Sequence, residues 1–67
     1  MSVVKVIEIL AESTKSWEDA TKLAVEEAAK TVRQIKNVYI KGFQAVVENN
    51  EVVRYRVDAK ISFIVEE

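Results

Sequence analysis

The sequence predicts an α+β fold of order β-α-β-β, in which a three-stranded antiparallel sheet is wrapped on one amphipathic helix. Three observations lead to this prediction. Apolar residues recur at helical spacing in residues 17–35, they alternate with polar residues in 53–65, and Asn49 and Asn50 form a tight-turn pair between two apolar runs. Pro is absent and Gly occurs once, so we expect long elements joined by few turns.

The length of 67 residues restricts the chain to a single domain, residues 1–67. A domain this small buries only about 60% of its unfolded-chain surface and usually needs a disulfide, a metal or oligomerisation for stability. The sequence has no Cys and no His, which excludes disulfides, thiolate and imidazole metal ligands, and His-based acid–base catalysis. Oligomerisation remains, and the hydrophobic content of 49% supports it.

The charge pattern excludes several classes of partner. The chain has 10 basic and 11 acidic residues without a basic block, so we expect no nucleic-acid or membrane partner. No apolar stretch is long enough to span a bilayer, and charges interrupt the apolar run in residues 1–10, so we expect a soluble cytoplasmic protein. There is no Ser–His–Asp constellation, no Gly-rich phosphate loop and no thiol nucleophile, so we do not expect an enzyme.

The first half of the chain is expected to form a strand over residues 3–10, a polar loop over 11–15 and a helix over 17–35. Ser16 is the expected helix cap, and Asp19 follows it three residues later, as in a capping box. The apolar stripe of this helix is rich in alanine, which would let the helix approach another surface closely. The stripe consists of Trp17, Ala20, Leu23, Ala24, Val25, Ala28, Ala29, Val32 and Ile35.

The second half is expected to form strands over residues 36–48 and 53–65. Gly42 within the first of these predicts a bulge or bend. The second would span on the order of 44 Å, whereas the predicted helix covers roughly 29 Å, so we expect the uncovered apolar surface to pack on other subunits. If this last strand lies between the other two, every neighbouring pair is antiparallel. The apolar face of the strand expected over residues 53–65 consists of Val53, Tyr55, Val57, Ala59, Ile61, Phe63 and Val65.

Five segments, in order along the whole chain, together match one known family: VVKVIEIL, ESTKSWEDA, AVEEAAKTVRQI, VVENNEVVRYRVDAKISF and VEE. On these segments the chain resembles the dodecins. The resemblance implies a hollow homododecamer with 23 symmetry. It also implies a flavin (riboflavin, FMN or FAD) bound in pairs at subunit interfaces, for storage or buffering rather than turnover.

The resemblance also implies which residues would touch a flavin. Members that bind flavin have a stacking Trp where this chain has Asn37, a Gln at the pyrimidine edge where it has Arg56, and in some cases an Arg at the phosphate near Gln44. Tyr39, two residues after Asn37 and on the same strand face, is the candidate replacement stacker, although simple packing is the interpretation we favour. Trp17 is expected to pack in the core or at an interface.

Two polar groups leave alternatives open. The first is a row on the last strand, formed by Arg54, Arg56 and Lys60. It either holds anionic ligands or makes cross-strand ion pairs on a solvated face, which we favour. The second is formed by Glu8, Glu12, Glu18 and Asp19. It could hold a divalent cation such as Ca²⁺ or Mg²⁺ at a symmetry axis, but we favour a solvated surface with helix-cap charges.

Three hypotheses follow for the function. The first is a homododecamer that sequesters flavin. The second is a dodecin-type shell without flavin, which is structural or holds ions or another small ligand. The third is a small interaction module, monomeric or dimeric, that binds a protein partner through its apolar sheet.

Overall fold

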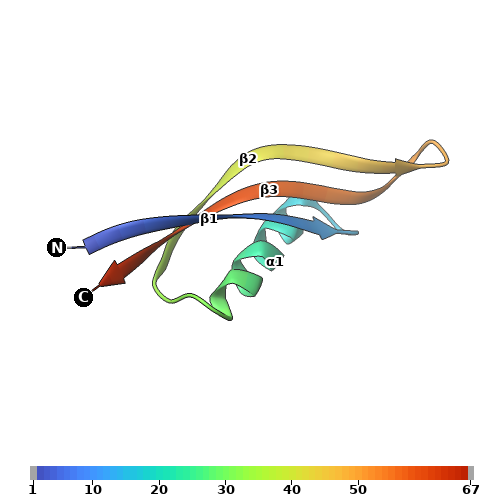
Figure 1. Cartoon of the computed structure of the whole chain (residues 1–67). Helices are drawn as coiled ribbons and strands as arrows, with labels where there is room; N and C mark the ends of the chain where they lie inside the picture. Colours follow the sequence, from blue (N-terminus) through green and yellow to red (C-terminus); the bar gives the residue numbers. More distant parts are fainter. Residues whose placement is uncertain (1, 67) are drawn as a thin grey trace.

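The computed structural model describes residues 2–66, which form three strands and one helix (Figure 1). The elements in chain order are β1 (Ser2–Ser13), α1 (Trp17–Ala29), β2 (Ile35–Glu48) and β3 (Glu51–Glu66). The strands form one antiparallel sheet in the order β1-β3-β2, so the predicted β-α-β-β fold with the last strand in the centre is confirmed. Within this range no helix has the length and apolar character needed to cross a membrane.

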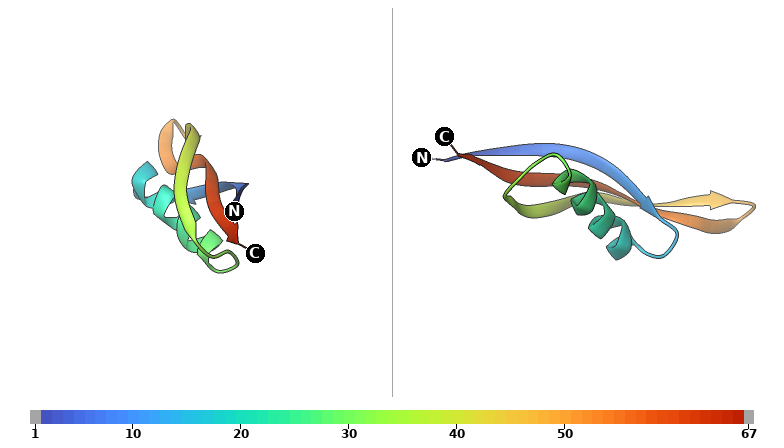
Figure 2. Two further views of the ribbon diagram at one scale, coloured as in Figure 1. Left: turned by 90° about the vertical axis from the view of Figure 1, so that its left-hand side faces the viewer. Right: turned by 90° about the horizontal axis from the view of Figure 1, so that it is seen from below.

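Helix α1 covers the middle of one face of the sheet, which we call the inner face (Figure 2). The alternation in β3 turns every second side chain toward the helix, and three of these are fully buried. The helix contributes three alanines one turn apart, whose small side chains let it lie close to the strands. The buried apolar residues are Ala20, Ala24, Ala28, Val57, Ala59 and Ile61.

The sheet extends beyond the helix at both ends. The chain measures 51 × 19 × 14 Å. The β2–β3 hairpin runs past α1 at one end, and the start of β1 with the end of β3 runs past it at the other (Figure 1). The expected apolar overhang is therefore present. The exposed large apolar residues are Val3, Val4, Val6, Leu10, Trp17, Leu23, Tyr39, Phe43, Val47 and Val52.

The start of α1 is held by local hydrogen bonds. The Asp19 backbone N–H donates to Ser16 Oγ at 2.9 Å, so the predicted cap is confirmed. The Asp19 carboxylate accepts a bond of 2.6 Å from the hydroxyl of Ser13, and the Lys15 N–H donates to the same hydroxyl. The end of β1 and the start of α1 are thus joined by one short side-chain network.

Strand β1 is longer than predicted. It continues to Ser13, through residues that we expected to lie in a loop. Ala11 pairs with Val57 and packs against the core, while Glu12 pairs with Arg56 and makes an ion pair with it. Pairing with β3 therefore extends the strand through residues whose local sequence is loop-like.

Helix α1 is shorter than predicted and ends at Ala29 instead of near Ile35. Thr31 and Val32 are β-branched, which disfavours helix, and Gln34 has φ 58°, a left-handed conformation that ends any right-handed helix. Val32 and Ile35 still pack against the core cluster, as their place in the apolar stripe suggested. The chain reaches that position through a loop.

Strands β2 and β3 are joined by the expected tight turn. Asn49 has φ 52° and Asn50 has φ 64°, the pair of positive values that a two-residue type I′ hairpin requires. The pairing of Glu48 with Glu51 on either side confirms the two-residue loop.

Asparagine tolerates the positive φ of position 50, whereas the β-branched side chain of valine does not. Replacing Asn50 with valine is therefore expected to destabilise the fold by about 1–2 kcal/mol. Asn50→Gly is the matched control and is expected to be neutral or slightly stabilising, because glycine adopts positive φ freely. Urea denaturation of both variants gives the comparison. Equal midpoints for valine and glycine would show that the turn does not hold this conformation in solution.

Candidate functional site

The four residues expected to touch a ligand lie on the face of the sheet turned away from α1, which we call the outer face. Residues paired directly across strands point to the same face. Since the odd-numbered residues 57, 59 and 61 of β3 point toward the helix, their even-numbered neighbours and the partners of those neighbours point away. The relevant pairs are Asn37 with Ser62, Tyr39 with Lys60, and Gln44 with Arg56.

A bulge in β2 is what places Gln44 on this face. The register of β2 against β3 shifts between Ile40 and Gly42, so the bulge predicted at Gly42 is confirmed. Without the extra residue, strict alternation would put Gln44 on the face opposite Asn37 and Tyr39. Because of the bulge, the odd-numbered residues Asn37 and Tyr39 before it and the even-numbered Gln44 after it all point to the outer face.

The candidate residues form two groups along the sheet and not one cluster. Tyr39, whose side chain is 62% exposed, stands beside Lys60 at one position. Arg56 and Gln44 lie four positions further along β3, at about 3.3 Å per residue, or roughly 13 Å away. Between the two groups Asp58 lies opposite Gly42, where an added Cβ would meet no atom within 4 Å.

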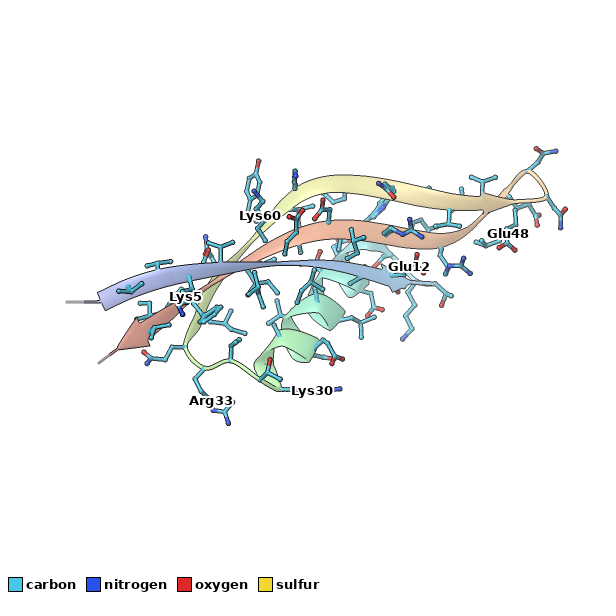
Figure 3. All side chains as sticks on the ribbon, viewed as in Figure 1. Lys5, Glu12, Lys30, Arg33, Glu48 and Lys60 are labelled. Carbon is cyan, nitrogen blue, oxygen red and sulfur yellow. The ribbon has the colours of Figure 1, made fainter. Side chains whose placement is uncertain are left out.

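Arg56 is held by residues from both neighbouring strands. Its Nε donates to Glu12 Oε2 at 2.6 Å, its Nη2 contacts the same carboxylate, and its Nη1 donates to Gln44 Oε1 at 3.3 Å. The other Glu12 oxygen lies 3.1 Å from Arg54 Nε, and Arg54 Nη2 lies 3.9 Å from a Glu48 oxygen. We call these five residues the Glu12 network. Glu12 at the end of β1 and Glu48 near the hairpin are labelled in Figure 3.

The network agrees with the ion-pair interpretation of the basic row for its two arginines. Arg54 and Arg56 make cross-strand ion pairs, as the favoured interpretation predicted. Lys60 stands opposite Glu8, and Glu8 in turn lies 3.7 Å from Lys41 Nζ. The sequence placed the basic residues on one face correctly, but it gave no sign that Glu12 would be their shared partner.

The hydrogen bond from Arg56 lowers the pKa of Glu12, and the charges of Arg56 and Arg54 act in the same direction. A carboxyl whose pKa is lowered on folding adds stability above its unfolded pKa, and this stability is lost as the pH falls through its folded pKa. We therefore expect wild-type protein to lose more thermal stability on acidification than the variant Glu12→Gln. Melting temperatures measured from neutral pH to about pH 3 test this. Parallel curves for the two proteins would contradict it.

The four acidic residues considered for a divalent cation do not come together in one chain. Glu12 is bound to arginines, Asp19 accepts from Ser13, and Glu8 lies near Lys41. Within residues 2–66 no group of three or more carboxylates is arranged to hold a metal ion. A cation site built from these residues would need carboxylates from several copies.

Trp17 packs at the join between the helix and the hairpin. Its ring meets Phe43 and Tyr55 edge to face, with centroids 5.9 and 5.0 Å apart, and its indole N–H donates to the Gln44 carbonyl at 2.9 Å. The sequence predicted a packing role for Trp17 but not which residues it would contact. The hydrogen bond fixes the backbone of the β2 segment whose side chain reaches Arg56 on the other face.

These features define a class of small β-α-β-β protein in which one helix covers the middle of a long sheet and the opposite sheet face is open. The family model for dodecin matches residues 3–66. The chain belongs to the dodecin family.

Individual relatives support the same assignment. The calcium dodecin of Mycobacterium tuberculosis is 35% identical over 63 residues, which cover 94% of this chain and 89% of that protein. Its crystal structure, described as a calcium-chelating immunodominant antigen with a novel calcium-binding site, has 31% identity and a TM-score of 0.84 over 96% of this chain and 91% of that one. An arginine-to-alanine variant of Thermus thermophilus dodecin has 27% identity and a TM-score of 0.93, with 100% of both chains covered.

Proposed function

We propose that the chain is a single-domain subunit of a homododecamer that binds a flavin on the outer face, between copies, for storage or buffering and not for turnover. The observation that carries this proposal is an acceptor without a donor in the middle of the candidate site. Asp58 Oδ1 is buried and has no hydrogen-bond partner among the described residues. Leaving a buried acceptor unsatisfied costs about 1–3 kcal/mol, so a turn of the half-buried Asp58 side chain that brings this oxygen to a donor from outside the chain would stabilise the site.

The surroundings of Asp58 fit a long, partly aromatic ligand. Tyr39 offers an exposed ring on one side, Gln44 and Arg56 offer polar groups on the other, and Gly42 leaves space between them. A flavin combines a flat ring system that stacks on aromatic side chains with a hydroxylated chain whose O–H groups can donate to a carboxylate. Its ring and chain together suit a site whose two ends are roughly 13 Å apart.

The exchanged residues retain the chemical groups that the family resemblance implies. That resemblance places Gln at position 56 and Arg near position 44, whereas this chain has Arg56 and Gln44. The two positions are direct cross-strand partners, and their side chains are joined by a hydrogen bond of 3.3 Å. A guanidinium and a carboxamide therefore remain side by side on the outer face, in exchanged order.

The exposed apolar surface supports assembly. On the outer side of the edge strand β1, Val4, Val6 and Leu10 are each 55–64% exposed. Burial of such side chains contributes about 25 cal/mol per Å², a large gain for a subunit this small. Assembly would also cover the unpaired edge of β1, which otherwise offers free backbone groups to other chains.

Light scattering combined with a riboflavin and FMN fluorescence titration tests the proposal. We expect a particle of about twelve times the subunit mass of 7.6 kDa and quenching of the bound flavin. Tyr39→Leu is expected to weaken binding by up to about tenfold, because it removes the stacking ring. Val47→Ala is the control, because Val47 is 57% exposed on β2 and pairs with Val52 near the hairpin, away from Tyr39. A monomer, or an absence of quenching, would overturn the proposal.

Calcium binding is the second candidate function. The M. tuberculosis relative is named for calcium, and it shares 35% identity with this chain. Because residues 2–66 of one chain do not gather three carboxylates, the site would lie between copies and calcium binding would require assembly. Calorimetric titration of Ca²⁺ into the assembled protein, with no flavin quenching in the parallel experiment, would favour this function over flavin storage.

A further inference from the structure

The edge of the Arg56 guanidinium that best matches an anionic ligand is already engaged within the chain. An arginine side chain offers five N–H donors in a planar fork, and the edge formed by Nε and one Nη matches a carboxylate or phosphate best. In this chain that edge is bound to Glu12, and the remaining Nη1 donates to Gln44. A phosphate could reach the strongest donors of Arg56 only by displacing Glu12.

Glu12 occupies a second arginine at the same time. Its Oε1 lies 3.1 Å from Nε of Arg54, an ion-pair contact in which that buried N–H makes no hydrogen bond within the described residues, while its Oε2 takes the bond from Arg56. One carboxylate from β1 therefore serves both guanidinium groups of β3. Its position is set by direct pairing with Arg56 in the sheet, so it is a fixed part of the fold.

The rest of the outer face carries no excess of positive charge. Around residues 54–62 of β3, four cationic side chains stand beside four carboxylates. The cations are Lys41, Arg54, Arg56 and Lys60, and the carboxylates are Glu8, Glu12, Glu48 and Asp58. The nearest groups to the proposed ligand thus sum to no net charge, and they offer no surplus attraction to a phosphate.

We propose that Glu12 is a specificity-determining residue, a built-in counter-anion that makes this face select an uncharged flavin such as riboflavin over its phosphate ester FMN. The inference rests on the proposed flavin function and adds to it the class of ligand. A phosphate ester reaches the Nε–Nη2 edge of Arg56 only if Glu12 leaves, and it meets Asp58 and Glu12 as like charges. An uncharged hydroxylated chain can donate to both carboxylates and leaves the ion pairs intact.

Comparing riboflavin and FMN affinities of the assembled wild type and two variants tests the inference. Wild type is expected to bind riboflavin at least as tightly as FMN. Glu12→Gln releases Arg56 and is expected to shift the affinity ratio toward FMN by on the order of tenfold. Glu48→Gln is the matched control, because it removes one negative charge from the same face while the bonds of Arg56 remain, and we expect little shift. In the double variant Glu12→Gln/Arg56→Gln the shift is expected to disappear.

A measurement on the unmodified protein keeps the inference testable if Glu12→Gln fails to assemble. With Arg56 occupied, the wild-type ratio of FMN to riboflavin affinity is expected to stay nearly constant between about 0.05 and 0.5 M salt, whereas a free guanidinium would make FMN binding fall steeply.

The outcomes separate the two proposals. Wild type that prefers FMN, or a ratio unchanged by Glu12→Gln, overturns the specificity inference while flavin storage stands. Absence of binding of either flavin to wild type overturns both.

Discussion

Replacing Ile61 with alanine is expected to lower the free energy of unfolding by about 2–5 kcal/mol. Ile61 is fully buried at the centre of β3, and it has Ile7 and Val38 as its partners on the two flanking strands. It is one of the two largest fully buried side chains. The buried residues of the helix that faces it are all alanines. The other buried residues of its core cluster, Ala24, Ala28 and Ala59, are too small to fill the space that its truncation would leave.

Chemical denaturation of the assembled protein measures this loss, which is large against the total of about 5–15 kcal/mol that is typical of small proteins. Val52→Ala is the matched control, because Val52 lies on the same strand but is 51% exposed near the hairpin. Its effect is expected to stay within about 0.5 kcal/mol. An equal loss for both variants would show that the end of β3 contributes as much as the part that α1 covers.

Replacing Asn37 with tryptophan is expected to raise flavin affinity by about one to two powers of ten. Asn37 is exposed and lies on the outer face next to Tyr39, so a new ring there would add a stacking surface without disturbing the core. Stacking of a nucleobase on an aromatic side chain contributes roughly 1–3 kcal/mol, and a flavin ring is chemically comparable. Fluorescence titration of the variant against riboflavin measures the gain directly.

Glu51→Trp controls for non-specific binding of flavin to an added, exposed tryptophan. Glu51 is exposed at the hairpin, far along the sheet from Tyr39. We expect no gain in flavin affinity from this variant. If both tryptophans raised affinity equally, the flavin site would not lie beside Tyr39.

The fold was predictable because its signals are local. The alternation in β3 assigned Val57, Ala59 and Ile61 to the buried face, and the Ser16 cap and the Asn49–Asn50 turn needed only neighbouring residues. The end of α1 was not predictable, because Val32 and Ile35 are partly buried against the core, as helix residues would be, yet lie in a loop and a strand. Periodicity indicates which side chains face the core, but a helix, a loop or a strand can each turn those side chains toward it.

The site was predictable only in part, because alternation assigns a residue to a face and leaves the register open. A shift of two residues keeps every side chain on its face, so no pattern in the sequence pairs Glu12 with Arg56, which are 44 residues apart. The bulge at Gly42 could be predicted, but its consequence for Gln44 depends on how many residues it inserts. The partners of Trp17 depend on the same register.

The packing of Trp17 gives the protein an internal optical probe. It is the single tryptophan, held between Phe43, Tyr55 and the Gln44 carbonyl, so its emission reports whether the helix start remains docked on the hairpin. Flavins absorb where tryptophan emits, and the proposed ligand would lie on the other side of the same β2 segment. Excitation of this one residue would therefore follow unfolding and, through energy transfer, ligand occupancy in the unlabelled wild-type chain.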